Sequence, residues 1–416
     1  MTSLKPRGEW LLRSRWRRAN APLTVVILFV LAAGTSPAAE AQTFTVLHTF
    51  TGPNGEGAYA GLVRDAAGNL YGATSQGGSS GDGLVFKLNP AGKETVLYSF
   101  TGVDGNSPNG VIRDVHGNLY GTTYAGGSGQ CRSDLGPGCG TVFRLDVKGN
   151  ETVLHSFTGG ADGAFPFAGL ILDAKGNLYG TAANGGAMSS CNGSGCGVVF
   201  KLNPSGKETV LYSFTGGTTD GCNPAGGLLR HKDNLYGTTY SCGASGYGTV
   251  FKVNTSGTET VLHSFAGGTT DGAEPYSGLV RDTEGVLYGT TLYGGQSSDG
   301  TVFMVSETGT ETVLHNFAGG ATDGEYPNAG VILDAKGNLY GDTFQGGPSN
   351  LGTVFELTMK KGPTGRRAHI TLLHSFTGFK GGVGPYGGVI RIAGNLYGTT
   401  SGGGRRGDGT VWQITK

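Results

Sequence analysis

The sequence predicts an all-β fold, a seven-bladed β-propeller made of four-stranded antiparallel blades. A tandem repeat of nearly constant period is the first observation behind this prediction, and four strand-like pieces in each repeat are the second. The third is that no segment sustains the 3.6-residue period of a helix, so almost no helix is expected. Because repeats of one period stack into a single body, residues 42–416 are expected to form one domain.

The repeat is organised around the string Asn-Leu-Tyr-Gly followed by threonines. Its tyrosine occurs seven times, at Tyr71, Tyr120, Tyr179, Tyr236, Tyr288, Tyr340 and Tyr397. Neighbouring copies lie 49 to 59 residues apart. That period leaves room for four strands and their turns, whereas a β-solenoid rung would need fewer residues. We expect these tyrosines to pack between blades with their hydroxyls hydrogen-bonded.

Each repeat contains four pieces with the composition of strands, in a fixed order. The first is a short apolar run such as Gly169–Asp173, and the second is the Asn-Leu-Tyr-Gly-Thr-Thr string. The third is similar to Gly140–Leu145 and the fourth to Glu151–Phe157. All are rich in β-branched and aromatic residues and are bounded by Gly, Asn, Asp or Pro. Apolar residues occupy both faces of the fourth piece, which favours a sheet covered on both sides.

The two ends of the mature chain predict how the ring closes. The chain begins with an unpaired strand of the fourth type, Thr45–Phe50, and ends on a strand of the third type, Gly409–Ile414. The N-terminal strand should therefore complete the last blade as its outer edge, with Val46 beside Val411. This pairing would cover a strand edge that would otherwise promote aggregation.

Residues 1–41 have the pattern of a secretory signal peptide. A basic stretch precedes an apolar run from Leu23 to Ala33, and Ala39-Glu40-Ala41 supplies small residues for cleavage before Gln42. An uncleaved anchor is the alternative, but the run has 11 residues and a membrane span needs about 20. We therefore expect an exported protein with no membrane span after cleavage, located extracellularly, on the cell surface or in the periplasm.

The charge balance limits the partners that this chain could have. The formal charge is zero overall, yet the part after residue 41 carries 24 basic against 28 acidic side chains. Such a chain has no basic field to neutralise phosphates, which argues against nucleic acid as a partner. We expect no cofactor and a monomeric protein.

Three consensus strings together resemble a known repeat: Gly-Asn-Leu-Tyr-Gly-Thr-Thr, Gly-Thr-Val-Phe-Lys-Leu and Glu-Thr-Val-Leu-His-Ser-Phe-Thr-Gly-Gly. They are similar to the GloVer-type tandem repeat of secreted bacterial choice-of-anchor proteins. The resemblance covers residues 43–416 and implies an exported, surface-associated β-propeller. The family pattern carries no catalytic residues, so it assigns none to this chain.

Six cysteines remain after residue 41, an even number in a protein expected to be exported. Six cysteines allow fifteen connectivities, and the positions of the loops favour three local disulfides: Cys131–Cys139, Cys191–Cys196 and Cys222–Cys242. A metal site is the alternative. It is disfavoured because the Cys-x4-Cys string has no matching second pair with histidines nearby.

The loops from fourth to first strand and from second to third strand should share one face of the propeller, which is the candidate ligand face. An acid recurs in the first kind of loop, as Asp104, Asp162, Asp220, Asp271 and Asp323. A near-ring of carboxylates around the channel mouth could hold a cation or a polyhydroxylated ligand. The alternative is that each aspartate starts a tight turn in its own blade, which its recurrence in most blades favours.

Tyrosines in these loops are the other candidates for ligand contact. Tyr124, Tyr240 and Tyr293 are predicted to contact a ligand, and Tyr276 and Tyr386 lie in loops on the same face. Exposed tyrosines beside glycines would suit stacking against sugar rings, although scattered tyrosines are common in loops.

A histidine recurs in the fourth strand, at His48, His155, His263, His315 and His374. Two blades carry Tyr98 and Tyr212 at this position instead. An aromatic residue that alternates with histidine favours a packing role with one hydrogen bond over a metal site.

These patterns favour a surface or extracellular binding or scaffold module for a carbohydrate, a peptide or a protein, rather than an enzyme. A glycan-active hydrolase or lyase is the alternative, with carboxylates such as Asp162 and Asp220 near the channel mouth. The sequence assigns no catalytic residue and no metal ligand.

Overall fold

The computed structural model describes residues 42–362 and 365–415. Residues 42–416 form one compact unit. The predicted signal peptide, residues 1–41, lies outside the described residues and stays a prediction. In the described part of the chain, no helix combines the length and the apolar character that crossing a membrane requires.

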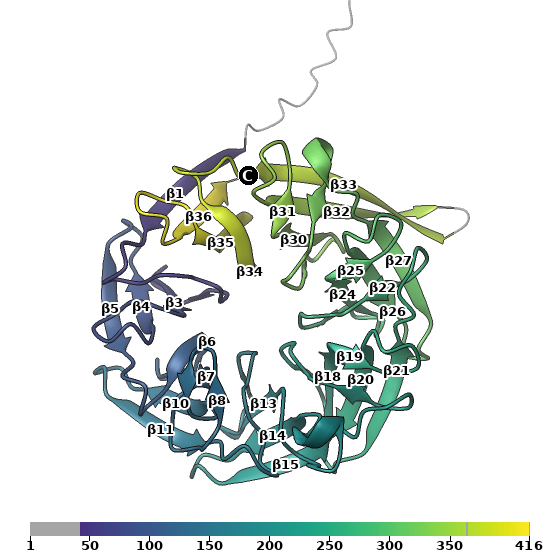
Figure 1. Ribbon diagram of the computed structural model, residues 1–416. Coiled ribbons are helices and arrows are strands. Elements are labelled where there is room, and N and C mark those ends of the chain that lie inside the picture. Colours follow the sequence, from purple (N-terminus) through teal and green to yellow (C-terminus); the bar gives the residue numbers. More distant parts are fainter. Residues whose placement is uncertain (1–41, 363–364, 416) are drawn as a thin grey trace, which may run out of the picture. The chain divides into compact units, whose positions relative to one another are not determined.

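Within the described residues, seven four-stranded antiparallel sheets surround a common axis as the blades of a β-propeller (Figure 1), as predicted. In blades 1 to 6 the strands follow chain order from the axis to the rim. Blade 1 consists of β2 (Val63–Arg64), β3 (Leu70–Thr74), β4 (Leu84–Leu88) and β5 (Glu94–Ser99). Blade 2 consists of β6 (Asn106–Arg113), β7 (Leu119–Ala125), β10 (Thr141–Leu145) and β11 (Glu151–Ser156). Blade 3 consists of β12 (Ile171–Leu172), β13 (Leu178–Ala182), β14 (Val198–Leu202) and β15 (Glu208–Ser213).

The remaining blades repeat this pattern. Blade 4 consists of β17 (Leu229–His231), β18 (Asn234–Thr239), β20 (Thr249–Asn254) and β21 (Glu259–Ser264). Blade 5 consists of β23 (Val280–Arg281), β24 (Leu287–Thr291), β26 (Thr301–Val305) and β27 (Glu311–Asn316). Blade 6 consists of β29 (Ile332–Leu333), β30 (Leu339–Thr343), β32 (Thr353–Gly362) and β33 (Gly365–Ser375). Blade 7 consists of β34 (Val383–Ile392), β35 (Asn395–Gly402), β36 (Thr410–Thr415) and β1 (Thr43–Thr49).

Short elements lie in the loops between these strands. The described residues contain four two-stranded sheets: β8 (Arg132–Ser133) with β9 (Gly136–Pro137), β16 (Gly221–Cys222) with β19 (Ser241–Cys242), β22 (Gly272–Ala273) with β25 (Tyr293–Gly294), and β28 (Gly324–Glu325) with β31 (Gln345–Gly346). Helical structure in the described residues is limited to two 3-10 turns, η1 (Cys191–Gly193) and η2 (Gly320–Thr322). The near absence of helix agrees with the prediction.

Strand β1 closes the ring by pairing antiparallel with β36. Val46 lies opposite Trp412, and His48 lies opposite Val411. The predicted closure of the last blade by the N-terminal strand is therefore confirmed. Phe50, just after β1, is fully buried against blade 1, so closure also joins the first and last blades through their core.

A β-bulge interrupts every pairing between third and fourth strands. In blade 2, Val142 lies opposite His155 and Phe143 lies opposite Val153, so Leu154 is the extra residue. The register of the other six blades shifts at the same place. A bulge changes which face of the sheet the following side chains occupy. Apolar residues therefore appear at both odd and even positions of the fourth strand. The sequence interpretation invoked covered faces alone and missed the bulge.

The core lies in the seams between blades. Each of the seven seams contains two buried aromatic rings 5.0–5.8 Å apart and steeply inclined, one from each blade: Phe50–Phe86, Phe100–Phe143, Phe157–Phe200, Phe214–Phe251, Phe265–Phe303, Phe317–Phe355 and Phe376–Trp412. Such edge-to-face pairs add about 0.5–1.5 kcal/mol each beyond the area that they bury.

The glycine of the Asn-Leu-Tyr-Gly string leaves room for the aromatic ring of the third strand in the same blade. A Cβ atom on Gly180 would lie 2.6 Å from the ring of Phe200, and one on Gly398 would lie 2.3 Å from Trp412. The tyrosine before it is buried in most blades, and its hydroxyl donates to an aspartate of the preceding turn. Tyr179, for example, donates to Asp173 over 3.1 Å. The predicted packing of these tyrosines is thus confirmed.

Candidate ligand-binding site

One face of the propeller is built by two kinds of loop that pair with each other. The small sheet of β16 and β19 joins the fourth-to-first loop of blade 4 to its second-to-third loop. The same pairing is made by β22 with β25 in blade 5 and by β28 with β31 in blade 6. The prediction that these two kinds of loop share one face is confirmed. We call this surface the loop face.

The fourth-to-first loops are fixed at the axis by bonds between neighbouring blades. In each loop one residue with positive φ precedes a proline, or an alanine in blade 1. The residue in blade 5 is Glu274, whose φ is 59° and whose N–H donates to the carbonyl of Tyr247 over 2.8 Å. Pro275 follows and packs close to Gly248, where an added Cβ would lie 2.8 Å from its ring. An unfavourable backbone conformation held by repeated contacts gives a rigid mouth.

The residue after this proline, or after the alanine of blade 1, varies between blades. It is aromatic in blades 1, 3, 5 and 7: Tyr59, Phe167, Tyr276 and Tyr386. The other three blades carry small or amide residues: Asn109, Ala225 and Asn328. Tyr124, in β7 of blade 2, adds a fifth ring. We call these five rings, Tyr59, Tyr124, Phe167, Tyr276 and Tyr386, the aromatic cup.

The five rings of the cup form a continuous chain of contacts across the mouth. The ring centroids of Tyr59 and Tyr386 lie 5.2 Å apart, and those of Tyr386 and Tyr276 lie 6.4 Å apart. Phe167 lies 6.0 Å from Tyr276 and 4.8 Å from Tyr124. Residues from blades 1, 2, 3, 5 and 7 therefore meet although they are up to 327 positions apart in the chain.

The rings of the cup line an open cavity of about 500 Å³. A volume of this size, lined by aromatic rings with a few polar groups, is typical of a small-molecule site. The polar and smaller lining residues come from blades 1 and 2: Ser75, Gln76, Ser107, Pro108, Asn109, Asp134 and Leu135.

A disulfide-closed loop forms one wall of the cavity. Asp134 and Leu135 are the tip between β8 and β9, and the Cys131–Cys139 disulfide closes the loop at its base. The side-chain amide of Asn106 donates to the carbonyl of Leu135 over 2.8 Å and to Asp82 over 2.7 Å. The wall is thereby tied to the body of blade 2.

Burial raises the pKa of three phenols of the cup, those of Tyr124, Tyr276 and Tyr386. Burial raises the pKa of Tyr276, and the neighbouring Tyr386 raises it further. Burial also raises the pKa of Tyr386. For Tyr124, burial and then the charge of Asp134 raise the pKa. The cup therefore offers hydroxyls and ring faces, with Asp134 as the one charged side chain among the residues that line the cavity.

The structure separates the tyrosines that the sequence singled out. Tyr124, Tyr276 and Tyr386 belong to the cup. Tyr240 packs against Tyr276 at 5.8 Å, but it is not among the lining residues. Tyr293 pairs with Tyr326 at 5.5 Å in another part of the loop face. Sequence reasoning missed Tyr59 and Phe167, which could have been found from their shared place in the fourth-to-first loop.

The recurring aspartates lie in the turns of their own blades. Asp220 accepts hydrogen bonds from the hydroxyl of Tyr212 over 3.0 Å and from the backbone N–H of Thr215 over 2.7 Å. The other four make the equivalent contacts in their turns: Asp104, Asp162, Asp271 and Asp323. These contacts agree with the alternative that each aspartate serves the tight turn of its own blade. None of the five lines the cavity of the cup, and ligand binding by them stays a prediction.

The histidines of the fourth strand complete these turns. The Nε2 atoms of His155, His263 and His315 lie 3.1–3.3 Å from the aspartate of the same turn, and that of His48 lies 3.1 Å from Glu94. His374 differs, because its ring stacks on Phe44 at 3.7 Å and burial lowers its pKa to about 4.

A glutamate from the next blade approaches several of these turns. Burial, followed by the charge of Asp220, raises the pKa of Glu259 to about 7. Between blades 4 and 5, one ligand atom each of His263, Asp271 and Glu311 lies within 4.8 Å of the others. A tyrosine occupies the histidine position in the turns beside Glu151 and Glu259. We therefore interpret the cluster as a polar contact between blades rather than a metal site.

Asp342 is a buried acid that the sequence analysis did not notice. Most blades carry a threonine at this position of the second strand, and the hydroxyl of Thr238 donates to the carbonyl of Ser277 in the next blade over 2.8 Å. Asp342 is 1% exposed, and burial raises its pKa to about 7.

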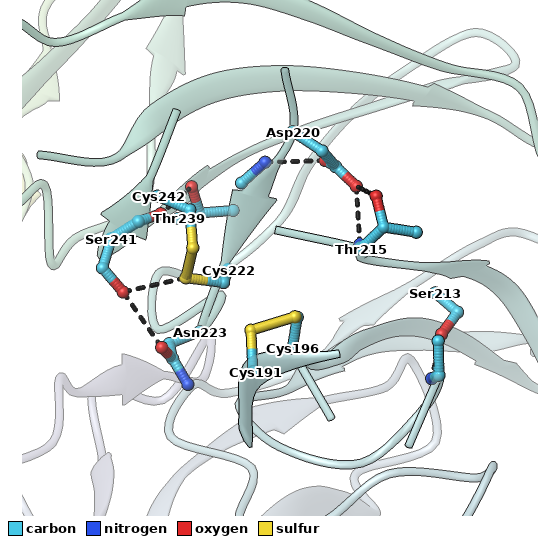
Figure 2. The surroundings of a disulfide bond; sticks show 12 residues. Cys191, Cys196, Ser213, Thr215, Asp220, Cys222, Asn223, Thr239, Ser241 and Cys242 are labelled. Carbon is cyan, nitrogen blue, oxygen red and sulfur yellow. Dashed lines mark hydrogen bonds between the residues drawn. A yellow bond between two sulfur atoms is a disulfide. The ribbon is translucent and has the colours of Figure 1, made fainter. Parts of the chain in front are cut away.

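The structure contains the three expected disulfides, Cys131–Cys139, Cys191–Cys196 and Cys222–Cys242. Figure 2 shows the last two near each other at the boundary of blades 3 and 4, and the sulfurs of Cys191, Cys222 and Cys242 lie within 4.8 Å of one another. The hydroxyl of Ser241 lies 3.1 Å from the sulfur of Cys222. Sulfurs in disulfides are not thiolates, so they do not form a zinc site.

Comparison with known proteins agrees with the repeat. The model of the Gloeobacter/Verrucomicrobia repeat matches residues 34–216, 137–355 and 307–416, which confirms the resemblance seen in the sequence. No curated protein matches the chain.

Among solved structures, the chain is similar to PorZ, a bacterial surface component of the type-IX secretion system of Porphyromonas gingivalis. The TM-score is 0.52 at 16% identity, over 88% of this chain and 47% of PorZ. It is also similar to a luciferin-regenerating enzyme, with a TM-score of 0.42 at 13% identity over 90% of this chain and 95% of that one. At such identities the likeness to PorZ shows the fold alone, and the second likeness carries no argument.

Proposed function

We propose, from the premise that the chain belongs to the Gloeobacter/Verrucomicrobia repeat family, that it is an exported binding module whose ligand site is the aromatic cup. The observation that carries this proposal is the cavity of about 500 Å³ in which rings from five blades converge. Aromatic surface with a few placed polar groups gives a ligand both burial and orientation.

Export is supported by two features of the chain. Three disulfides fit an oxidising compartment outside the cytosol. Residues 1–41 have the n-region, apolar run and small-residue site of a signal peptide. We propose that the mature protein acts outside the cytoplasm, at the cell surface, in the surrounding medium or in the periplasm.

The cup favours a small molecule, or a side chain protruding from a partner, over a flat protein surface. Its cavity is concave, and the disulfide-closed loop rises beside it as a wall. Polar groups such as Gln76 and Asn109 stand at its edge, where they could select among ligands that fit the rings.

The alternative of a glycan hydrolase finds no supporting observation. Hydrolases of this kind generally use two carboxyl groups that face the scissile bond. Asp162 and Asp220 are held in the turns of two different blades, and Asp134 is the one carboxylate among the cavity-lining residues.

The experiment is a ligand screen on residues 42–416 with matched variants. Sugars, peptides and small organic ions are titrated while tyrosine fluorescence and heat are recorded. Phe167→Ala should weaken the binding of any ligand of the cup by at least tenfold. Tyr293→Ala, an exposed tyrosine outside the cup, should leave it unchanged. A ligand that binds equally well to both variants would place the site elsewhere and overturn the proposal.

A further inference from the structure

Three of the four ring pairs in the cup stand at steep angles, and the fourth, Tyr124 with Phe167, is tilted by 53°. The interplanar angle is 83° between Tyr59 and Tyr386, 80° between Tyr276 and Tyr386, and 69° between Phe167 and Tyr276. A flat sugar ring needs one open aromatic face to stack on. Rings set at steep angles to one another suit a rounded group that touches several of them at once.

The electrostatics of the cavity favour a positive ligand. The face of an aromatic ring carries negative charge density and attracts cations. Asp134, an exposed residue, adds a carboxylate at the wall, and no lysine, arginine or histidine is among the residues that line the cavity. Arg132 lies two positions before Asp134, and its side chain is exposed.

Tyr276 and Tyr386 carry no ionised group that would pair with a strongly hydrated cation, because burial raises the pKa of both phenols. Tyr276 and Tyr386 pack edge to face with ring centroids 6.4 Å apart, and Asp134 is the one carboxylate among the residues that line the cavity. A strongly hydrated ammonium would lose water without full compensation here. An alkylated ammonium binds water weakly and loses little on entering the cup.

We infer that the aromatic cup recognises an alkylated ammonium group, with its charge against the rings and beside Asp134. This inference rests on the proposed function, since it names the chemistry of the ligand that the cup would bind. The group could come from a free small molecule such as choline or from a trimethylated lysine on a peptide. The shared chemistry is the trimethylammonium ion.

The test compares a cation with its neutral twin. Choline and 3,3-dimethylbutan-1-ol have the same shape, but only the first is charged, so cation recognition predicts at least tenfold tighter binding of choline by calorimetry. A trimethyllysine peptide titrated in parallel distinguishes a free ligand from one carried on a chain. Asp134→Asn should weaken choline binding severalfold while leaving the neutral alcohol unchanged.

Paired substitutions at Tyr276 separate ring from hydroxyl. Tyr276→Phe keeps the ring and should keep choline binding within about twofold, whereas Tyr276→Leu should lose at least tenfold. The circular dichroism spectrum and melting temperature of each variant check that the fold is retained. Phe167→Leu removes a second ring of the cup, at a more exposed position.

The possible failures are distinct. Equal binding of choline and the alcohol, or a neutral sugar that binds the cup when choline does not, would overturn the inference and leave the proposed function standing. Choline binding that survives both Tyr276→Leu and Phe167→Leu would place any cation site elsewhere. A complete lack of cup-dependent binding across the whole ligand screen would overturn the proposed function as well.

Discussion

The blade seams and the aromatic cup are built by the same repeat, yet they differ in what varies from blade to blade. In the seams, the ring of the third strand and its partner recur seven times, with Trp412 as the single enlargement. In the cup, one loop position holds Tyr276 in blade 5 and Ala225 in blade 4. Residues that recur hold each blade to the next, whereas residues that vary shape one place on the ring.

The largest expected effect tests the seam side of this comparison. Phe200→Ala removes a fully buried ring from the seam between blades 2 and 3 and should lower the free energy of unfolding by about 3–5 kcal/mol. Phe167→Ala removes a ring that is 37% exposed and should cost far less. Chemical denaturation of both variants measures the difference. Equal losses would mean that the cup also serves to hold the blades.

A smaller effect is expected at the glycine of the repeat string. Gly180→Ala would push a methyl group against the ring of Phe200 and should cost about 1–3 kcal/mol through overpacking. Gly169→Ala is the matched control, because no atom lies within 4 Å of its added Cβ. If denaturation gives the same midpoint for both variants, the ring of Phe200 does not require a glycine at position 180.

A third effect depends on pH and concerns a departure from the repeat inside the core. Burial holds the pKa of Asp342 at about 7, while an unfolded chain releases that proton near pH ~4. The folded state then binds more protons between these values, so the stability contributed by Asp342 falls as pH rises toward 7.

Asp342→Thr restores the common residue and should raise the melting temperature at pH 8 more than at pH 5. Thermal melts of the variant and the parent protein at both pH values check this. Glu259 has a raised pKa of about 7 and is left in place, so part of the pH dependence should persist. A variant with an unchanged melting temperature at pH 8 would contradict the argument.

The fold could be predicted because the repeat encodes the same four-stranded blade seven times. The period, the four strands and the unpaired ends Thr45–Phe50 and Gly409–Ile414 together left a closed ring as the consistent arrangement. The disulfides followed because each pair of cysteines lies in loops at one end of a blade. Local bulges such as the one at Leu154 were not foreseen, since a single extra residue leaves no periodic trace.

The cup could be predicted only in part because it is made by closure. Tyr124, Tyr276 and Tyr386 were noticed as loop tyrosines, but nothing local shows that they meet. Tyr59 and Phe167 gain meaning only when their loops are aligned by position and brought around one axis. The stacking of His374 on Phe44 arises likewise from the meeting of blades 6 and 7. Contacts of this kind depend on the whole ring.

The central claim is that ligand binding belongs to the varying cup and not to the recurring turns. The most direct measurement is a calorimetric titration of a ligand found in the screen against Phe167→Ala and Asp220→Asn side by side. We expect Phe167→Ala to lose at least tenfold in affinity and Asp220→Asn to bind as the parent protein does. Loss of binding in Asp220→Asn with retention in Phe167→Ala would contradict this claim.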